Sequence, residues 1–99
     1  MRRILPLVLP AFLAGCGASP SPAFFGAERT EVARDGRDYV VFRKGDRVEV
    51  IRLGHARSGE HAGIHATMIA LVPEVTGCAL RGATLQGDSG EMRGRLTCG

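Results

Sequence analysis

The fold of this chain depends on residues 28–53, which read ERTEVARDGRDYVVFRKGDRVEVIRL. Its apolar residues lie in short runs bounded by turn signals, as in β-strands, whose successive side chains point to opposite faces. Asp35-Gly36 is a strong signal for a two-residue hairpin loop, and Lys44-Gly45 is a weaker one. The stretch therefore predicts three antiparallel strands joined by two tight turns.

The two turns also predict a register. A loop at 35–36 places Thr30 opposite Val41 and Val32 opposite Tyr39, and a loop at 44–45 places Val41 opposite Val48. One face of the meander then carries Thr30, Val32, Tyr39, Val41, Val48 and Val50. The other face is mixed and carries Arg29, Glu31, Val40, Phe42, Arg47 and Glu49. One buried face and one mixed face are typical of an antiparallel sheet that is covered on one side.

A helical stripe follows the meander. Apolar side chains recur at helical spacing at Ile64, Met68, Leu71, Val72 and Val75. Ser58 is a candidate N-cap for a helix beginning near Gly59, and Gly77 is a natural stop. Pro73 is expected to kink the helix or to begin a separate last turn.

Residues 79–98 predict a final hairpin centred on Asp88. This centre pairs Leu80 with Leu96, Gly82 with Gly94, Thr84 with Met92, and Cys78 with Cys98. The predicted fold is therefore α+β: a small antiparallel sheet in the order β-β-β-α-β-β, with one helix packed on one face.

The chain begins with a basic and then apolar leader. Met1-Arg2-Arg3 precedes an apolar run over residues 4–13, which is shorter than the about 20 residues needed to cross a bilayer. Leu13-Ala14-Gly15-Cys16 follows directly, and this tetrapeptide resembles the lipobox of bacterial lipoproteins. The resemblance implies that residues 1–15 are a signal peptide removed before Cys16. It also implies that the Cys16 thiol carries a diacylglycerol and that the new amino group is acylated.

The resemblance places the protein in the bacterial cell envelope. An ordinary secretory signal and an uncleaved signal anchor are the alternatives. Gly17, where an aspartate would favour retention in the inner membrane, favours the outer membrane facing the periplasm. The body of the chain loosely resembles small alphaproteobacterial lipoproteins, and that resemblance implies no activity.

Residues 16–27 predict a lipid-anchored tether, because Ser19-Pro20-Ser21-Pro22 favours an extended backbone. Phe24 and Phe25 are expected to dock on the domain, with insertion into the membrane interface as the alternative. The small α+β domain then comprises residues 28–99.

The cysteine count fits this scheme. With Cys16 lipidated, Cys78 and Cys98 remain as a pair, and an oxidising compartment favours a disulfide between them. The bridge would stabilise the domain by roughly 3 kcal/mol in the chain-entropy model. It would join adjacent strands or, because disulfide geometry is restrictive, the start of one strand and a looser C-terminus.

The charge pattern argues against nucleic-acid binding. The net charge is +3, and removal of Arg2 and Arg3 leaves 11 basic against 10 acidic residues. The two signs are interleaved, and the chain has no Trp and one Tyr, so both a basic stripe and stacking platforms are missing. Arg81, Arg93 and Arg95 fall on the outer side of the last hairpin. They are interpreted as a solvated face that protects an edge strand, with an anion-binding patch as the alternative.

Gly87-Asp88-Ser89-Gly90 resembles the stretch around the nucleophile of chymotrypsin-like serine proteases. However, Glu91 stands where that motif continues with glycine, and a triad also needs a histidine base, a buried carboxylate and an oxyanion hole. A hairpin turn is the favoured interpretation, since each of these residues has turn chemistry. No catalytic residue is predicted.

His61 and His65 are four residues apart and would share a helix face, where His55 or Glu60 would be further zinc ligands. The pattern lacks a defined fourth ligand, so no metal site and no cofactor are predicted. Whether the three histidines bind metal stays open at this point.

The sequence predicts a non-enzymatic envelope lipoprotein that acts as an accessory or interaction module. Its partners would be the membrane, through the lipid anchor, and an envelope protein. The alternative is a periplasmic inhibitor or ligand-binding lipoprotein, with the 54–60 loop inserted into the cleft of a lysozyme or protease. A hydrolase is the least favoured class, because nucleophile, base and orienting group do not form a set.

Overall fold

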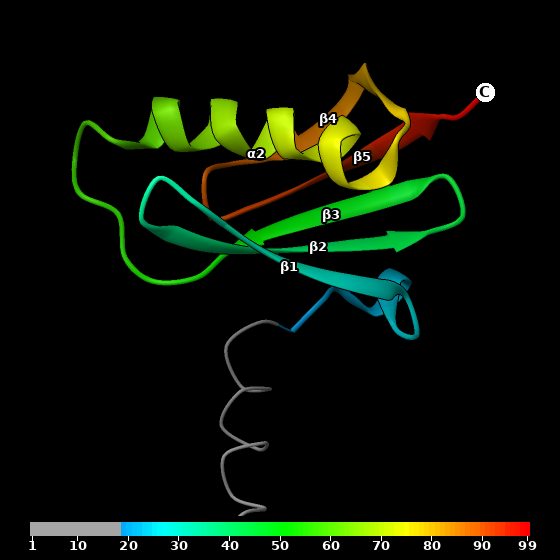
Figure 1. The fold of residues 1–99 in the computed structure, drawn as a ribbon, viewed down its shortest axis with the longest axis horizontal. Helices are drawn as coiled ribbons and strands as arrows, with labels where there is room; N and C mark the ends of the chain where they lie inside the picture. Colours follow the sequence, from blue (N-terminus) through cyan, green and yellow to red (C-terminus); the bar gives the residue numbers. More distant parts are fainter. Residues whose placement is uncertain (1–18) are drawn as a thin grey trace, which may run out of the picture.

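The computed structural model describes residues 19–99 and confirms the α+β prediction. A short 3-10 helix, η2 (Pro22–Phe24), precedes the strands β1 (Glu28–Arg34), β2 (Arg37–Lys44) and β3 (Arg47–Arg52). The helix α2 (His61–Thr76) is followed by β4 (Ala79–Gly87) and β5 (Glu91–Thr97). The five strands form one antiparallel sheet in the order β1-β2-β3-β5-β4 (Figure 1).

The first hairpin has the predicted register, with Val32 opposite Tyr39. The predicted position of the second turn is wrong. The loop is Gly45-Asp46, and Val41 pairs with Val50 instead of Val48. Gly45 has a φ of 62°, and glycine at the first central position is typical of a type II′ hairpin turn. The pairing moves by two residues, so every side chain stays on its predicted face.

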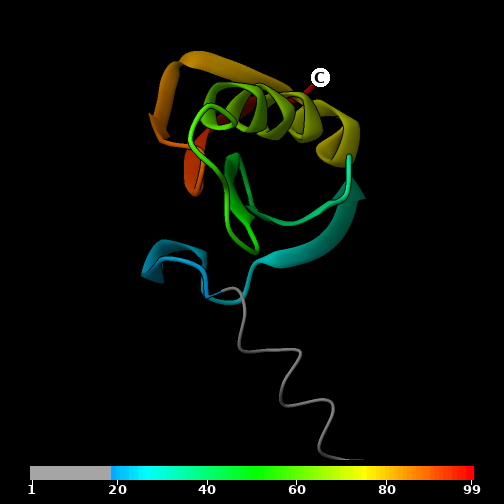
Figure 2. The same ribbon diagram turned by 90° about the vertical axis from the view of Figure 1, so that its left-hand side faces the viewer.

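One face of the sheet is covered by α2 (Figures 1 and 2). The predicted helical stripe is confirmed, because four of its members are buried and Val75 packs beside them. This core consists of Tyr39, Val41, Val48, Val50, Ile64, Met68, Leu71, Val72, Cys78, Met92 and Leu96. Val32 is partly buried against this core, whereas Thr30 is exposed.

The ends of α2 differ in part from prediction. Ser58 is not its cap: Glu60 holds that position and makes no capping hydrogen bond through its side chain. The helix runs through Pro73 as one element, so the separate last turn is wrong. Pro73 has no amide proton, so one backbone hydrogen bond of the helix is missing. The last turn has an additional hydrogen bond, from the Thr76 hydroxyl to the Val72 carbonyl. The helix ends at Gly77, as predicted.

The second face of the sheet is not left to solvent. Phe24 is only 3% exposed and packs with Val40 and Phe42, next to Ile51 and Leu53. The N-terminal segment therefore lies on the side of the sheet opposite α2 (Figure 2). Packing begins near Ser21, so the folded body extends closer to the N-terminus than the predicted start at residue 28.

The last hairpin is correct only in its outer half. Leu80 pairs with Leu96 as predicted, but Gln86 pairs with Arg93, and the register shifts between residues 81 and 86. The predicted Gly82–Gly94 and Thr84–Met92 pairs are therefore wrong. The Thr84 hydroxyl occupies the irregular stretch: it accepts the Arg95 amide at 2.9 Å and donates to the Arg81 carbonyl at 2.6 Å. The Thr84 side chain thus takes the place of the backbone acceptor that the Arg95 amide of β5 would have in a regular ladder.

Cys78 and Cys98 form the predicted disulfide, with their Cα atoms 4.6 Å apart. Cys78 precedes β4 and Cys98 follows β5, so the bridge lies just outside the two strands. The two cysteines are opposite each other, one position beyond the Ala79–Thr97 pair, as predicted. Among residues 19–99, no helix has the length and apolar character that crossing a bilayer requires. The predicted signal peptide and Cys16 lie outside the described residues.

Candidate functional site

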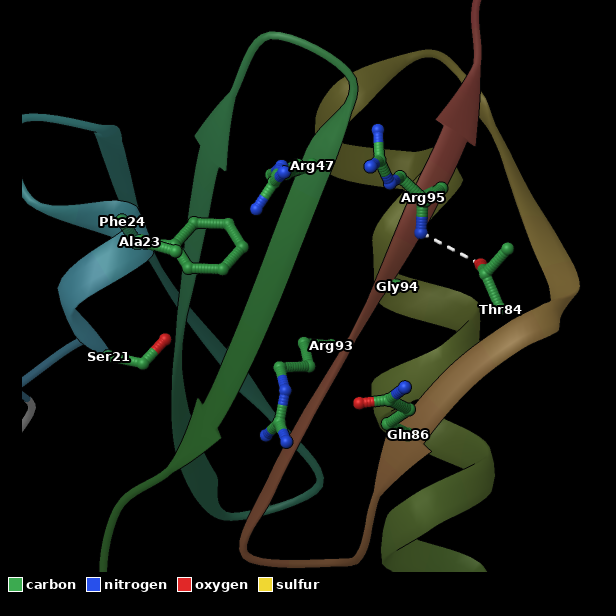
Figure 3. Close-up of a pocket in the computed structure, with 9 residues that line it drawn as sticks. All are labelled: Ser21, Ala23, Phe24, Arg47, Thr84, Gln86, Arg93, Gly94 and Arg95. Atoms are coloured by element: carbon green, nitrogen blue, oxygen red, sulfur yellow. Dashed lines mark hydrogen bonds between the residues drawn. The ribbon is translucent and has the colours of Figure 1, made fainter.

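A groove lies on the face opposite α2 and is lined in part by arginine side chains. We call it the basic groove. It has a volume of about 260 Å³, and one wall comes from η2 and the residue before it. Figure 3 shows its lining, which consists of Ser21, Ala23, Phe24, Arg47, Thr84, Gln86, Arg93, Gly94 and Arg95. The groove exists because the N-terminal segment docks beside β3 and β5 instead of extending away from the sheet.

Three guanidinium groups line the basic groove from neighbouring strands. Arg47 and Arg95 are paired across β3 and β5, so they share a face. Arg95 donates to both Asp46 oxygens, at 2.9 and 3.1 Å, and Arg93 donates to both Glu91 oxygens, at 2.7 and 2.9 Å. Both pairs are partly exposed and contribute little to stability. Within residues 19–99, the Arg47 side chain makes no hydrogen bond, which leaves it available to an anion.

Glu49 is the one buried acid of this face, at 1% exposure. Its position pairs with Phe42 on β2 and Arg93 on β5, and its Oε1 accepts the Ser21 amide at 3.0 Å. Burial, and after it the adjacent Glu91 carboxyl, raise the pKa of Glu49 to about 7, although the hydrogen bond from the Ser21 amide opposes the shift. Glu49 therefore fastens the N-terminal segment to the sheet with a carboxyl that titrates near neutral pH.

This raised pKa predicts a pH effect on stability. The folded protein holds a proton that the unfolded chain, with an ordinary value of 4.5, releases first. The contribution of Glu49 is thus present below about pH 4.5 and is lost as pH rises through about 7. Across this pH range, Glu49 should lower the free energy of unfolding of the wild type by at most about 3 kcal/mol. We expect Glu49→Gln to remove this decrease. Urea unfolding of both proteins from pH 4.5 to 8 measures it.

Glu28→Gln is the matched control, because Glu28 is exposed at the start of β1. This variant should keep the pH profile of the wild type. If Glu49→Gln also kept that profile, Glu49 would not carry the proton assigned to it.

The predicted arginine face is correct in part. Arg93 and Arg95 line the basic groove, whereas Arg81 does not. They do not protect an edge, because β5 lies inside the sheet and only Arg81 is on an edge strand, β4. Arg47 and Glu49 were missed as site residues, although the alternation had already placed both on the mixed face. The signal that would have pointed to them is Phe24, because an aromatic side chain packed on the mixed face covers part of it and leaves Arg47 and Glu49 beside it.

Gly87-Asp88-Ser89-Gly90 forms the turn between β4 and β5. The Asp88 amide donates to the Glu91 carbonyl at 2.8 Å, and Asp88 Oδ1 accepts the amides of Gly90 and Glu91 at 2.8 and 3.2 Å. Those hydrogen bonds lower the pKa of Asp88. The two amides that follow Ser89 are therefore engaged by Asp88 and do not form an oxyanion hole.

The structure does bring Ser89 to a histidine. The Ser89 hydroxyl lies 2.6 Å from His61 Nδ1, and the Ser89 carbonyl accepts Arg52 Nη1 at 2.9 Å. Ser89 is buried, so this contact holds the turn against the first turn of α2 and the end of β3. Sequence analysis missed the Ser89–His61 contact because 28 residues separate the two side chains.

The histidines do not converge on a metal site. Within the described part of the chain, no three His, Cys, Asp or Glu side chains are grouped to hold an ion. His55 is exposed in the loop, and Glu60 accepts the Arg57 amide at 2.8 Å and Arg37 Nη2 at 2.9 Å. These bonds lower the pKa of Glu60 and fasten one end of the 54–60 loop.

The basic groove presents guanidinium N–H donors along its lining, with Arg93 turned toward Glu91 and Arg95 turned toward Asp46. At the β4–β5 turn, the buried Ser89 hydroxyl is held by the His61 imidazole. Comparisons with protein-family models, with curated proteins and with solved structures give no match. Guanidinium groups on two adjacent strands suit carboxylate or phosphate oxygens, which they bind by charge-assisted hydrogen bonds.

Proposed function

We propose that this protein is a lipid-anchored lipoprotein of the bacterial cell envelope, whose domain acts as a non-enzymatic interaction module. The observation that carries the proposal is Leu13-Ala14-Gly15-Cys16, directly after a basic and apolar leader. Two or three acyl chains on one residue give stable membrane attachment, because each buried CH₂ contributes about 0.8 kcal/mol. The outer membrane, facing the periplasm, is the proposed location.

The rest of the chain is consistent with this role. The disulfide between Cys78 and Cys98 suits an oxidising compartment and leaves Cys16 as the free thiol for lipid. The basic groove lies beside Ser21, where the tether joins the domain, so a cationic surface is on the tether side. An interaction module needs such a displayed surface and no set of catalytic groups.

The test is the mass of the protein extracted from cell membranes with detergent. We expect a polypeptide that begins at Cys16 and carries diacylglycerol plus an amide-linked acyl chain. Cys16→Ser should abolish both the cleavage and the acyl mass, whereas Cys98→Ser should retain them. A different N-terminus, or no acyl mass, would refute the proposal. If the protein carries the acyl mass, crosslinking in intact cells followed by mass spectrometry would identify its envelope protein partner.

A further inference from the structure

The docked N-terminal segment makes the tether short. Residues 16–27 would separate the domain widely from the membrane if all of them were free. However, Phe24 is buried and the Ser21 amide is bonded to Glu49, so the chain is attached to the sheet from Ser21 onward. Five peptide units join Cys16 to Ser21, and they span at most about 18 Å. With lipid on Cys16, the domain stays within that distance of the bilayer surface.

The surface beside Ser21 is cationic. Arg47, Arg93 and Arg95 line the basic groove, and Lys44 lies at the adjacent turn, where its Nζ donates to the Phe25 carbonyl at 2.8 Å. Two carboxylates, Asp46 and Glu91, contact these four cations, so positive charge is in excess. Arg93 and Arg95 use only Nη1 for those carboxylates, and their other N–H groups remain available to an anion.

Phe25 adds an apolar group to the same place. Phe24 and Phe25 are neighbours, but the first is 3% exposed and the second is 62% exposed. Phe25 is the one large hydrophobic side chain of residues 19–99 that stands in solvent to this degree. An exposed aromatic ring next to cations is typical of a surface that binds at the headgroup level of a bilayer.

We propose that the lipid-anchored domain lies with Lys44 and the basic groove against anionic phospholipid headgroups, and with Phe25 inserted at the interface. This inference rests on the proposed lipid anchor. The anchor confines the domain near the surface, so a weak attraction is enough to set its orientation. Basic residues are attracted to anionic lipid mainly within a Debye length of about 8 Å, and the short tether keeps them near that range.

The test uses the membrane-extracted, acylated protein with Phe25→Trp, because the chain has no other tryptophan. It is reconstituted into vesicles of phosphatidylcholine alone or of phosphatidylcholine mixed with phosphatidylglycerol, both with brominated acyl chains as quencher. We expect tryptophan emission to be quenched roughly twofold more in the anionic vesicles, and high salt to remove the difference.

Two charge reversals make the test specific. Arg47→Glu, in the Phe25→Trp background, should abolish the difference between the two lipids. Arg57→Glu should retain it, because Arg57 is equally exposed but lies in the loop between β3 and α2. Equal quenching in both lipids, or no effect of Arg47→Glu, would overturn the proposed orientation while an acyl mass on the protein upholds the anchor. Absence of acyl mass would overturn both.

Discussion

Phe24→Ala should lower the free energy of unfolding by about 3 kcal/mol, which is the low end of the range for replacing a buried phenylalanine with alanine. Phe24 is the aromatic centre of the small cluster on the face away from α2, where it covers Val40 and Phe42. Its removal leaves a cavity and uncovers both neighbours. The loss is expected to be near the low end because the N-terminal segment can relax toward the sheet. Equilibrium urea unfolding measures the change.

Phe25→Ala is the matched control, since the two residues are adjacent and differ in exposure. It should change the free energy of unfolding by less than about 0.5 kcal/mol, as surface substitutions usually do. Phe24→Ala should also speed hydrogen exchange of the Ser21 amide, which is held by Glu49 in the docked segment. Equal effects of the two substitutions would mean that η2 is not packed as described.

Cys98→Ser should cost about 3 kcal/mol by opening the loop that the disulfide closes across 20 residues of sequence separation. Cys98 is exposed and Cys78 is buried, so this substitution removes the crosslink without altering the core. A domain of this size has a small core, and total stabilities of about 5 kcal/mol are common at the low end. The bridge therefore accounts for a large part of the stability.

Reductant separates the crosslink from other effects of the serine. Wild-type protein unfolded in urea with reductant should match Cys98→Ser, and the variant should not respond to reductant. A wild-type protein whose urea midpoint is the same with and without reductant would contradict a stabilising disulfide.

The stability losses expected for Phe24→Ala and Cys98→Ser arise at two different places in the domain. Phe24 closes the N-terminal side of the sheet, and the disulfide closes the open end of the β4–β5 hairpin, whose inner half is irregular. The basic groove lies between the N-terminal segment, which contributes one wall, and β5, which contributes Arg93 and Arg95.

The candidate site was only partly predictable for a related reason. Alternation placed Arg47 and Glu49 on the mixed face, and the last hairpin placed Arg93 and Arg95 on its outer side. The predicted order did not state that β3 pairs with β5, and this pairing is what brings the two sets of side chains together. Segments separated by a helix carry no local signal of which edge they join, so the groove appears only in the assembled sheet.

The amino-acid pattern alone determined the number of strands and their order along the chain, the face of every residue in the meander, the buried stripe of α2 and the Cys78–Cys98 pairing. These features depend on periods of 2 and 3.6 residues and on turn chemistry, which are local. Tertiary structure decided the Gly45-Asp46 turn and the shift within β4. It also decided that Phe24 docks on Val40 and Phe42, whereas Phe25, which was expected to dock as well, stays exposed. A pairing that moves by two residues keeps every side chain on its face, and a docked aromatic must find a distant surface. Local periodicity therefore does not indicate the exact strand register or the surface on which an aromatic side chain docks.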